Sequence, residues 1–273
     1  MNTVAQTPSR PLRAPGSRRI LFPKEHGAYG QLLFPMVTAL LLGSQLPLPG
    51  LGLALAFFLV FLLHEPLLVL LGHRGGRARE QFQQLARRQS LVLAVATVTV
   101  LACVAPWLSA KALGSILLPG AAAAGISVFV LLGKERTTAG ELTAAAGLSA
   151  CCVPIAVADG VRVASASVCW VIWAVVLMAA TLAVRGVIAR AKYGEEKLAL
   201  WAVGLGAAGA ALVAGMLPIL ALPRILLWAV APAVALPLVL LVLKPSPKYL
   251  RAIGWSAMAV DFAIVGVLVA ALR

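Results

Sequence analysis

Long apolar runs dominate the chain, and short polar segments separate them. A helix that crosses a membrane needs about 20 mostly apolar residues, because in hydrocarbon every backbone polar group must be bonded within the segment. Nine stretches come close to this length: Ala28–Leu46, Leu51–Leu71, Leu91–Ser109, Ala112–Leu132, Leu142–Ala158, Ser165–Val184, Leu198–Pro218, Pro223–Leu243 and Ala252–Leu272. We therefore predict an all-α fold, a polytopic bundle of nine transmembrane helices.

The composition agrees with this pattern. The 273 residues are 62% hydrophobic and 12% charged, whereas a soluble domain is nearer half apolar and a quarter charged. This excludes an ordinary soluble enzyme. The four cysteines all lie in apolar stretches without metal-ligand spacing, so we predict buried thiols and no metal site. The chain has no P-loop, no GxGxxG and no HExxH motif, and it therefore indicates no particular cofactor.

Basic residues are concentrated in every second one of the segments that separate the apolar stretches. Lys and Arg collect in cytoplasmic loops of membrane proteins. With the N-terminus inside, the inner segments hold 19 of the 23 basic residues, and the outer segments hold only Lys111, Arg162, Arg224 and Arg273. One span more or fewer would destroy this alternation. We therefore predict a cytoplasmic N-terminus and a C-terminus outside.

The formal charge of +14 arises mainly from these inner segments. Charge that is spread over cytoplasmic loops faces anionic lipid, so membrane lipid is the expected partner and nucleic acid is not. Residues 1–22 are rich in arginine and proline and contain no acid. We predict that they form a disordered basic cytoplasmic tail, and that residues 23–273 form a single transmembrane helical domain.

The second apolar stretch carries His64, Glu65 and Pro66 in succession. An ionisable side chain inside a span is costly unless it is paired or hydrated, so each is a candidate for function. Pro66 predicts a kink, and His64 titrates near neutrality. His64 and Glu65 are therefore candidates for proton or cation chemistry. Alternatively, Glu65 pairs with an arginine of a neighbouring loop and only stabilises helix packing.

The first apolar stretch is preceded by Pro23, Lys24, Glu25, His26 and Gly27. An acid in a first helical turn complements the helix dipole, which explains Glu25 but not His26. Glycines near a helix start weaken the helix by about 1 kcal/mol each, unless another group approaches the backbone closely. We therefore predict that Glu25 and His26 contribute to a functional site.

Four basic residues at the cytoplasmic ends of the fourth and sixth spans are candidates for anion binding: Lys134, Arg136, Arg185 and Arg190. Each one taken singly also fits a side chain that reaches from the span into the membrane interface. Together with Arg87, Arg88 and the His26 region, they would surround a mouth that suits a phosphate or an anionic headgroup. Asp261, near the middle of the last span, is predicted to be a buried acid that bonds to a neighbouring helix, with a proton relay as the alternative.

The segment Pro23-Lys24-Glu25-His26-Gly27-Ala28-Tyr29, followed by Leu32-Leu33-Phe34-Pro35, resembles the YwiC-like family of bacterial integral membrane proteins. Those proteins open with a Pro-Lys-(Glu/Gln)-His-Gly-Ala-aromatic signature. The motif is short but specific, and length and hydropathy agree over the whole chain. The resemblance implies a multi-pass protein of the bacterial inner (cytoplasmic) membrane and no particular activity.

The nine spans, the segment Gly30–Pro35 and the basic segment Lys134–Arg136 also resemble UbiA-type prenyltransferases, more distantly. That superfamily binds an isoprenyl diphosphate through two Asp-rich motifs that hold magnesium. In their place this chain has His64, Glu65, His73, Arg74, Arg185, Arg190 and Lys192. Magnesium requires clustered carboxylates. The resemblance therefore implies a UbiA-like fold without that metal-dependent chemistry.

Three functions remain open from the sequence. The first is a UbiA-like bundle that binds or modifies an amphipathic anion in a cytoplasm-facing cavity. The second is a transporter of a small solute, which the buried acids and the intraspan prolines Pro35, Pro66, Pro154 and Pro232 favour. The third is a non-catalytic structural membrane protein in which every buried charge belongs to a packing pair. The sequence does not decide whether the protein is an enzyme.

Overall fold

The computed structural model describes residues 20–23, 26–43 and 48–273, apart from the side chain of His26. Within these ranges the chain is helical and contains no strand. The helices are α1 (His26–Leu42), α2 (Leu48–Leu70), α3 (Gly76–Val104), α4 (Ala110–Ser115), α5 (Leu117–Leu131), α6 (Thr138–Ser149), α7 (Cys152–Ala158), α8 (Val163–Tyr193), α9 (Lys197–Ile219), α10 (Leu226–Val230), α11 (Pro232–Leu243) and α12 (Leu250–Leu272). Short 3-10 turns precede α4 and α12.

Eight helices, single or in collinear pairs, are long and apolar enough to cross a membrane in the part that the structure describes. The prediction of an all-helical, multi-pass membrane protein is thereby confirmed. The first predicted span differs from the structure, because α1 ends at Leu42, before Gly43. Its 17 residues form about 25 Å of helix, less than a bilayer core of about 30 Å. The count of nine spans therefore stays a prediction.

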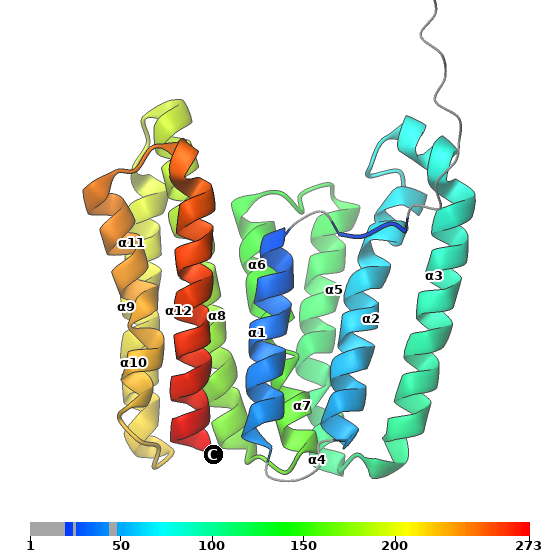
Figure 1. Cartoon of the computed structure of the whole chain (residues 1–273), viewed down its shortest axis with the longest axis horizontal. Coiled ribbons are helices and arrows are strands. Elements are labelled where there is room, and N and C mark those ends of the chain that lie inside the picture. Colours follow the sequence, from blue (N-terminus) through cyan, green and yellow to red (C-terminus); the bar gives the residue numbers. More distant parts are fainter. Residues whose placement is uncertain (1–19, 24–25, 44–47) are drawn as a thin grey trace, which may run out of the picture.

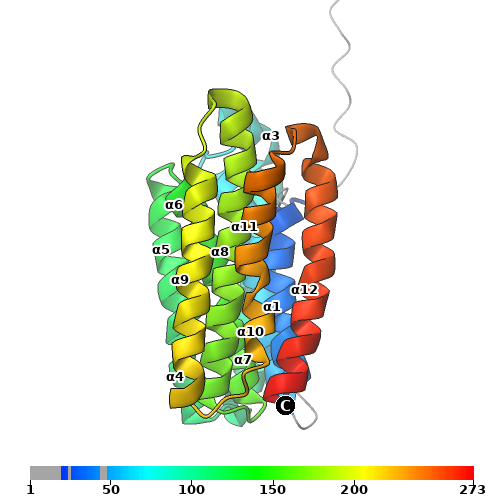
Figure 2. The same cartoon turned by 90° about the vertical axis from the view of Figure 1, so that its left-hand side faces the viewer.

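The helices stand side by side, and α8 lies at the centre of the bundle (Figures 1 and 2). It packs against α6, α9 and α11, and the fully buried side chains of Ile172 and Trp173 come from its middle. At one edge, α3 packs mainly on α2. Toward the other, α12 packs on α1 and α10, so that α1 lies between α2 and α12.

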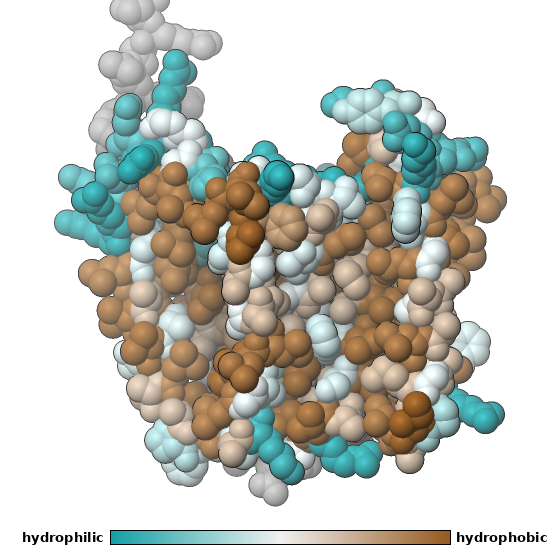
Figure 3. All heavy atoms as spheres, turned by 180° about the vertical axis from the view of Figure 1, so that it is seen from behind, coloured by the Kyte–Doolittle hydropathy of each residue, from teal (hydrophilic) through white to brown (hydrophobic). Residues whose placement is uncertain are grey.

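The loops that connect α2 to α3, α5 to α6, α8 to α9 and α11 to α12 all lie at one end of the bundle (Figure 1). We call this the basic end, because these loops and the helix ends that adjoin them hold most of the Lys and Arg residues predicted to be cytoplasmic. The other three loops from α3 onward and the C-terminus lie at the opposite end. An apolar belt separates the two polar ends (Figure 3). The structure therefore places the basic loops together, as the charge alternation predicts.

Prolines interrupt some of these helices and not others. A proline removes one backbone donor and clashes with the carbonyl four residues before it. The helix breaks between α6 and α7 near Ala150, four residues before Pro154, and a second break between α10 and α11 falls at Ala231, just before Pro232. In contrast, Pro35 and Pro66 lie inside continuous helices. Of the four intraspan prolines named from the sequence, Pro154 and Pro232 lie near a helix break and Pro35 and Pro66 do not, because proline position alone does not decide whether a helix is interrupted.

Candidate functional site

Glu65 forms a buried ion pair with Arg74. The guanidinium Nε donates to Oε1 at 2.9 Å, and Nη2 donates to Oε2. Glu65 is 3% exposed. A two-point pair of this kind is stronger and more specific in geometry than a single contact. The structure thus agrees with the alternative predicted from the sequence, in which Glu65 pairs with a loop arginine.

The turn after α2 brings this arginine back to the helix. Gly72 adopts a left-handed conformation with φ of 82°. Its N–H donates to the Val69 carbonyl, and the N–H of His73 donates to the Leu68 carbonyl, which together cap the end of the helix. The chain therefore reverses directly after α2. This reversal brings Arg74 back beside Glu65, which lies nine positions earlier in the sequence.

Arg185 of α8 binds the first turn of α6. Its Nε and Nη2 donate to the two carboxylate oxygens of Glu141, Nη1 donates to Thr138 Oγ1 at 3.0 Å, and Nη2 also donates to the carbonyl of Arg136. The carboxylate also lies at a helix N-terminus, where negative charge is favoured. These bonds engage each of the three guanidinium nitrogens, so Arg185 joins α8 to α6.

The loop between α5 and α6 is held tightly against the start of α6. Gly133 adopts a left-handed conformation with φ of 64°, and the N–H of Lys134 donates to the Phe129 carbonyl at 2.7 Å. Thr137 Oγ1 accepts from the N–H of Gly140 at 3.2 Å and caps α6. A Cβ at Gly140 would lie 2.6 Å from the Lys134 carbonyl oxygen. This position therefore requires glycine, and the loop presents residues 135 and 136 in a fixed conformation.

A cavity of about 80 Å³ lies at the basic end between α2, α5 and α6. Its polar wall consists of His64, Arg74, Glu135, Arg136 and Glu141, and the rest of the wall is apolar. The oxygen Oε2 of Glu135 is buried and accepts no hydrogen bond from a described residue. The structure thus brings His64 and Arg136 to one cavity, together with the partners of Glu65 and Arg185.

Other candidates lie elsewhere. Arg190 Nη1 and Nη2 donate to the carbonyls of Leu240 and Pro245 at 3.4 and 3.3 Å, so this side chain joins α8 to the end of α11. Lys134 is exposed and does not line the cavity. Asp261 is partly buried on α12 and has no hydrogen bond or ion pair with a described residue.

The predicted motif before α1 can be compared with the structure only in part. Glu25 lies outside the described residues, and so does the side chain of His26, although its backbone begins α1. Whether these two residues belong to the cavity stays a prediction.

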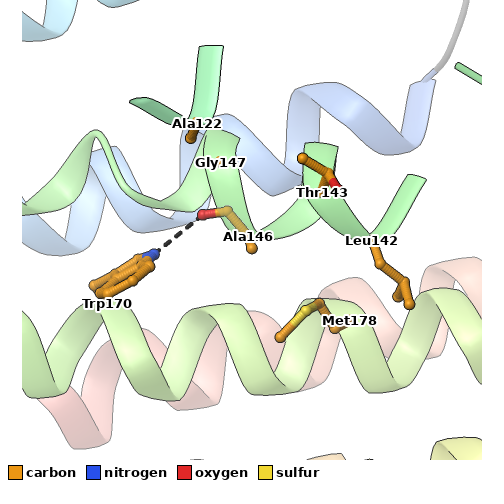
Figure 4. Close-up of a pocket in the computed structure, with 7 residues that line it drawn as sticks. All are labelled: Ala122, Leu142, Thr143, Ala146, Gly147, Trp170 and Met178. Carbon is orange, nitrogen blue, oxygen red and sulfur yellow. Dashed lines mark hydrogen bonds between the residues drawn. The ribbon is translucent and has the colours of Figure 1, made fainter. Parts of the chain in front are cut away.

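An apolar groove lies between α5, α6 and α8 (Figure 4). Its volume is about 300 Å³, and Trp170 and Met178 line it from α8. The indole N–H of Trp170 donates to the Ala146 carbonyl at 3.0 Å. With that donor satisfied, the groove presents mainly hydrocarbon.

Two acidic residues of the structure were missed by the sequence analysis. Glu141 was placed outside the predicted fifth span; an acid one turn after Thr137 could have identified it as a residue of the first helical turn. Asp159, at the opposite end, accepts from the Gly50 N–H at 2.9 Å and so caps α2. Burial raises the pKa of Asp159, and the Gly50 hydrogen bond partly offsets this. An Asp-Gly pair signals a turn, but not its contact with a distant helix.

A family model described as YwiC-like protein matches residues 22–157. The match covers α1 to α6 and most of α7, and so includes every residue that lines the cavity; Arg185, Arg190 and Asp261 lie beyond it. No curated protein matches the chain, and no solved structure matches it.

Proposed function

Because residues 22–157 place the chain in the YwiC-like family, we propose that this multi-pass membrane protein belongs to the bacterial inner membrane and binds the head of an amphipathic anion at its basic end. The basic end faces the cytoplasm in this proposal, as the distribution of Lys and Arg predicts. A UbiA-like arrangement of the helices is part of the same proposal and is supported by sequence resemblance alone.

One observation carries the proposal, namely that the cavity of about 80 Å³ gathers polar side chains between apolar helices. Arg136 lines it and forms no ion pair with a described residue. A guanidinium is always charged and matches the geometry of carboxylate and phosphate groups. Arg136 is therefore the residue that we expect to bind the anion, since Arg74 and Arg185 are bound to glutamates.

A chemical role at this site would fall to His64. Its imidazole lines the same cavity as Arg136, and a histidine side chain can act as a general acid or base, so it could transfer a proton to or from a bound group. That Glu25 and His26 also contribute to such proton chemistry stays a prediction. If the protein only binds its ligand, the same geometry serves recognition without reaction.

Mass spectrometry of lipids bound to the purified full-length protein tests the proposal. We compare the wild type, Arg136→Gln and Arg77→Gln after equilibration with phosphatidylglycerol in mixed micelles. Arg77 is an exposed arginine of α3 and provides a matched loss of charge at the same end. Arg136→Gln should bind roughly tenfold less lipid, because a hydrogen bond to a charged group is lost. Arg77→Gln should bind as the wild type does. Equal binding by all three proteins would contradict the proposal.

A second candidate is a structural role without a ligand. It is favoured by the separate pairing of charges at the basic end: Glu65 with Arg74, Glu141 with Arg185, and Glu196 with Lys244 at 2.6 Å. In the third of these pairs, Lys244 lowers the pKa of Glu196 by hydrogen bonding and by its charge. If these contacts serve only to join helices, phosphatidylglycerol should not bind the wild type above the level of Arg136→Gln.

Transport has weaker support. The interrupted helices α6–α7 and α10–α11 have the form that discontinuous helices take in transporters. However, Glu65 and Asp261 come from α2 and α12, and α1 lies between these two helices (Figure 1), which gives no support to a path lined by both acids.

A further inference from the structure

Two charged side chains of the cavity have no ion-pair partner among the described residues once the two arginine–glutamate pairs are set aside. They are Glu135 and Arg136, which are consecutive in the tight loop before α6 and line the same cavity. The Glu135 oxygen Oε2 is buried, and no described residue donates to it. A buried charged acceptor without a donor is costly, so a group in the cavity is expected to donate to it.

We infer that the cavity binds a headgroup in which a primary ammonium stands beside a phosphate, with the ammonium at Glu135 and the phosphate at Arg136. This inference rests on the proposed function: the anionic group bound at Arg136 is a phosphate, and the ligand also carries a primary ammonium, so that its headgroup is zwitterionic. The charge complement follows from the residues themselves, because one negative and one positive group are available.

The walls of the cavity favour an ammonium with hydrogens over a methylated one. Quaternary ammonium groups are recognised by cages of several aromatic rings, whereas Phe129 is the one aromatic ring apart from the imidazole of His64 among the described residues that line this cavity. A primary ammonium instead offers three donors to carboxylate oxygens. The volume of about 80 Å³ holds a few water-sized groups, which suits such a small head and leaves the hydrocarbon chains outside.

The loop geometry supports joint recognition. Gly133 and Gly140 hold the loop against α6, and Arg185 donates to the carbonyl of Arg136. The positions of residues 135 and 136 are therefore set before a ligand arrives, which lowers the entropic cost of binding. The pairs of Glu65 and Glu141 neutralise the neighbouring arginines, so the charge preference of the cavity depends mainly on Glu135 and Arg136.

Native mass spectrometry of the full-length protein in mixed micelles tests the inference with three lipids of equal chain length. Phosphatidylethanolamine carries the primary ammonium, phosphatidylcholine carries its trimethylated form, and phosphatidylglycerol carries the phosphate without an amine. The wild type should bind phosphatidylethanolamine roughly tenfold more tightly than phosphatidylcholine. Glu135→Gln should abolish this preference, and Glu135→Asp should keep part of it. Glu195→Gln, an exposed acid at the same end, is the matched control and should behave as the wild type does.

The outcomes separate the two proposals. If the wild type binds phosphatidylglycerol through Arg136 but does not distinguish the other two lipids, the inference fails and the proposed function stands. If none of the three lipids binds, both fail. A preference for phosphatidylethanolamine that survives Glu135→Gln, in a variant with unchanged melting temperature, also overturns the inference. Competition by soluble O-phosphoethanolamine shows whether the head alone suffices; if it competes as well as the lipid does, the ligand is a free phosphate ester.

Discussion

Two regions of the basic end each contain a Glu–Arg ion pair, and the two pairs differ in burial and in sequence separation. In the α2–α3 region, Glu65 and Arg74 are nine residues apart, and their side chains are 4% and 17% exposed. In the α6–α8 region, Glu141 and Arg185 are 44 residues apart, and their side chains are 39% and 24% exposed. The first pair forms within one helix and its turn, whereas the second joins two helices that are distant in the sequence.

This difference predicts different energetics. A buried pair is expensive to break, because the remaining charge is left in a medium that solvates it poorly. A partly hydrated pair contributes less, because water and salt screen it. The local turn therefore produces the contact on which stability depends more strongly, and the long-range contact contributes through several smaller bonds.

Removing the guanidinium from the buried pair should have the largest effect. Arg74→Ala leaves the Glu65 carboxylate in a nearly closed site, and we expect a loss of about 3–5 kcal/mol in the free energy of unfolding. Equilibrium unfolding of the purified protein by SDS in mixed micelles measures this loss.

A double-mutant cycle provides the control for this prediction. Glu65→Gln combined with Arg74→Ala removes both charges, and most of the lost stability should return, because no unpaired charge remains. A loss below about 1 kcal/mol for Arg74→Ala alone would show that water reaches Glu65 and that the two regions do not differ.

Arg185→Ala should have an intermediate effect. The variant loses a partly exposed ion pair, which is typically worth up to about 1 kcal/mol, and hydrogen bonds to Thr138 and to the Arg136 carbonyl. We expect a loss of about 1–2 kcal/mol in the same SDS unfolding measurement. Arg190→Ala, on the same helix, removes two longer bonds to carbonyls and serves as the comparison. If Arg190→Ala costs more than Arg185→Ala, the α6–α8 pair is not the main polar link of α8.

The helical class and the grouping of the connecting loops at the two ends of the bundle were predictable from the sequence. Apolar runs are long, and basic residues recur after every second run, so both the helical class and the grouping of loops follow from simple rules. The exact helices were less predictable. α3 begins at Gly76, well before the predicted Leu91, because its first half is polar and a criterion of about 20 apolar residues does not detect a polar helix.

The site was predictable in its residue types but not in its pairs. His64, Glu65 and Arg136 were identified because ionisable groups near apolar spans are rare. The partners Arg74 and Glu141 depend on how a turn reverses and on which helices pack together, and neither is encoded at a fixed spacing. The sequence therefore predicted a basic mouth, whereas the structure contains mostly neutral pairs around a small cavity.

A third carboxylate extends the comparison, because Asp159 forms no ion pair with an arginine among the described residues. Its Oδ1 accepts from the Gly50 N–H, and its Oδ2 is buried without a described partner. Burial raises the pKa of Asp159 above the usual value of about 3.9. The folded state therefore binds more protons than the unfolded state from about pH 4 up to the raised pKa, and stability decreases as the pH rises through that range.

Asp159→Asn keeps an oxygen that can accept from Gly50 and removes the titration. The melting temperature of the wild type in detergent should decrease from pH 4 toward pH 7 relative to that of Asp159→Asn, by the smallest of the three effects, because the side chain is only half-buried. Other carboxylates titrate equally in both proteins, so the difference between their pH curves isolates Asp159. Parallel curves would mean that water solvates the buried oxygen Oδ2. The Asp159 carboxylate, at the end opposite the basic end, would then be stable as a charged group without an arginine partner.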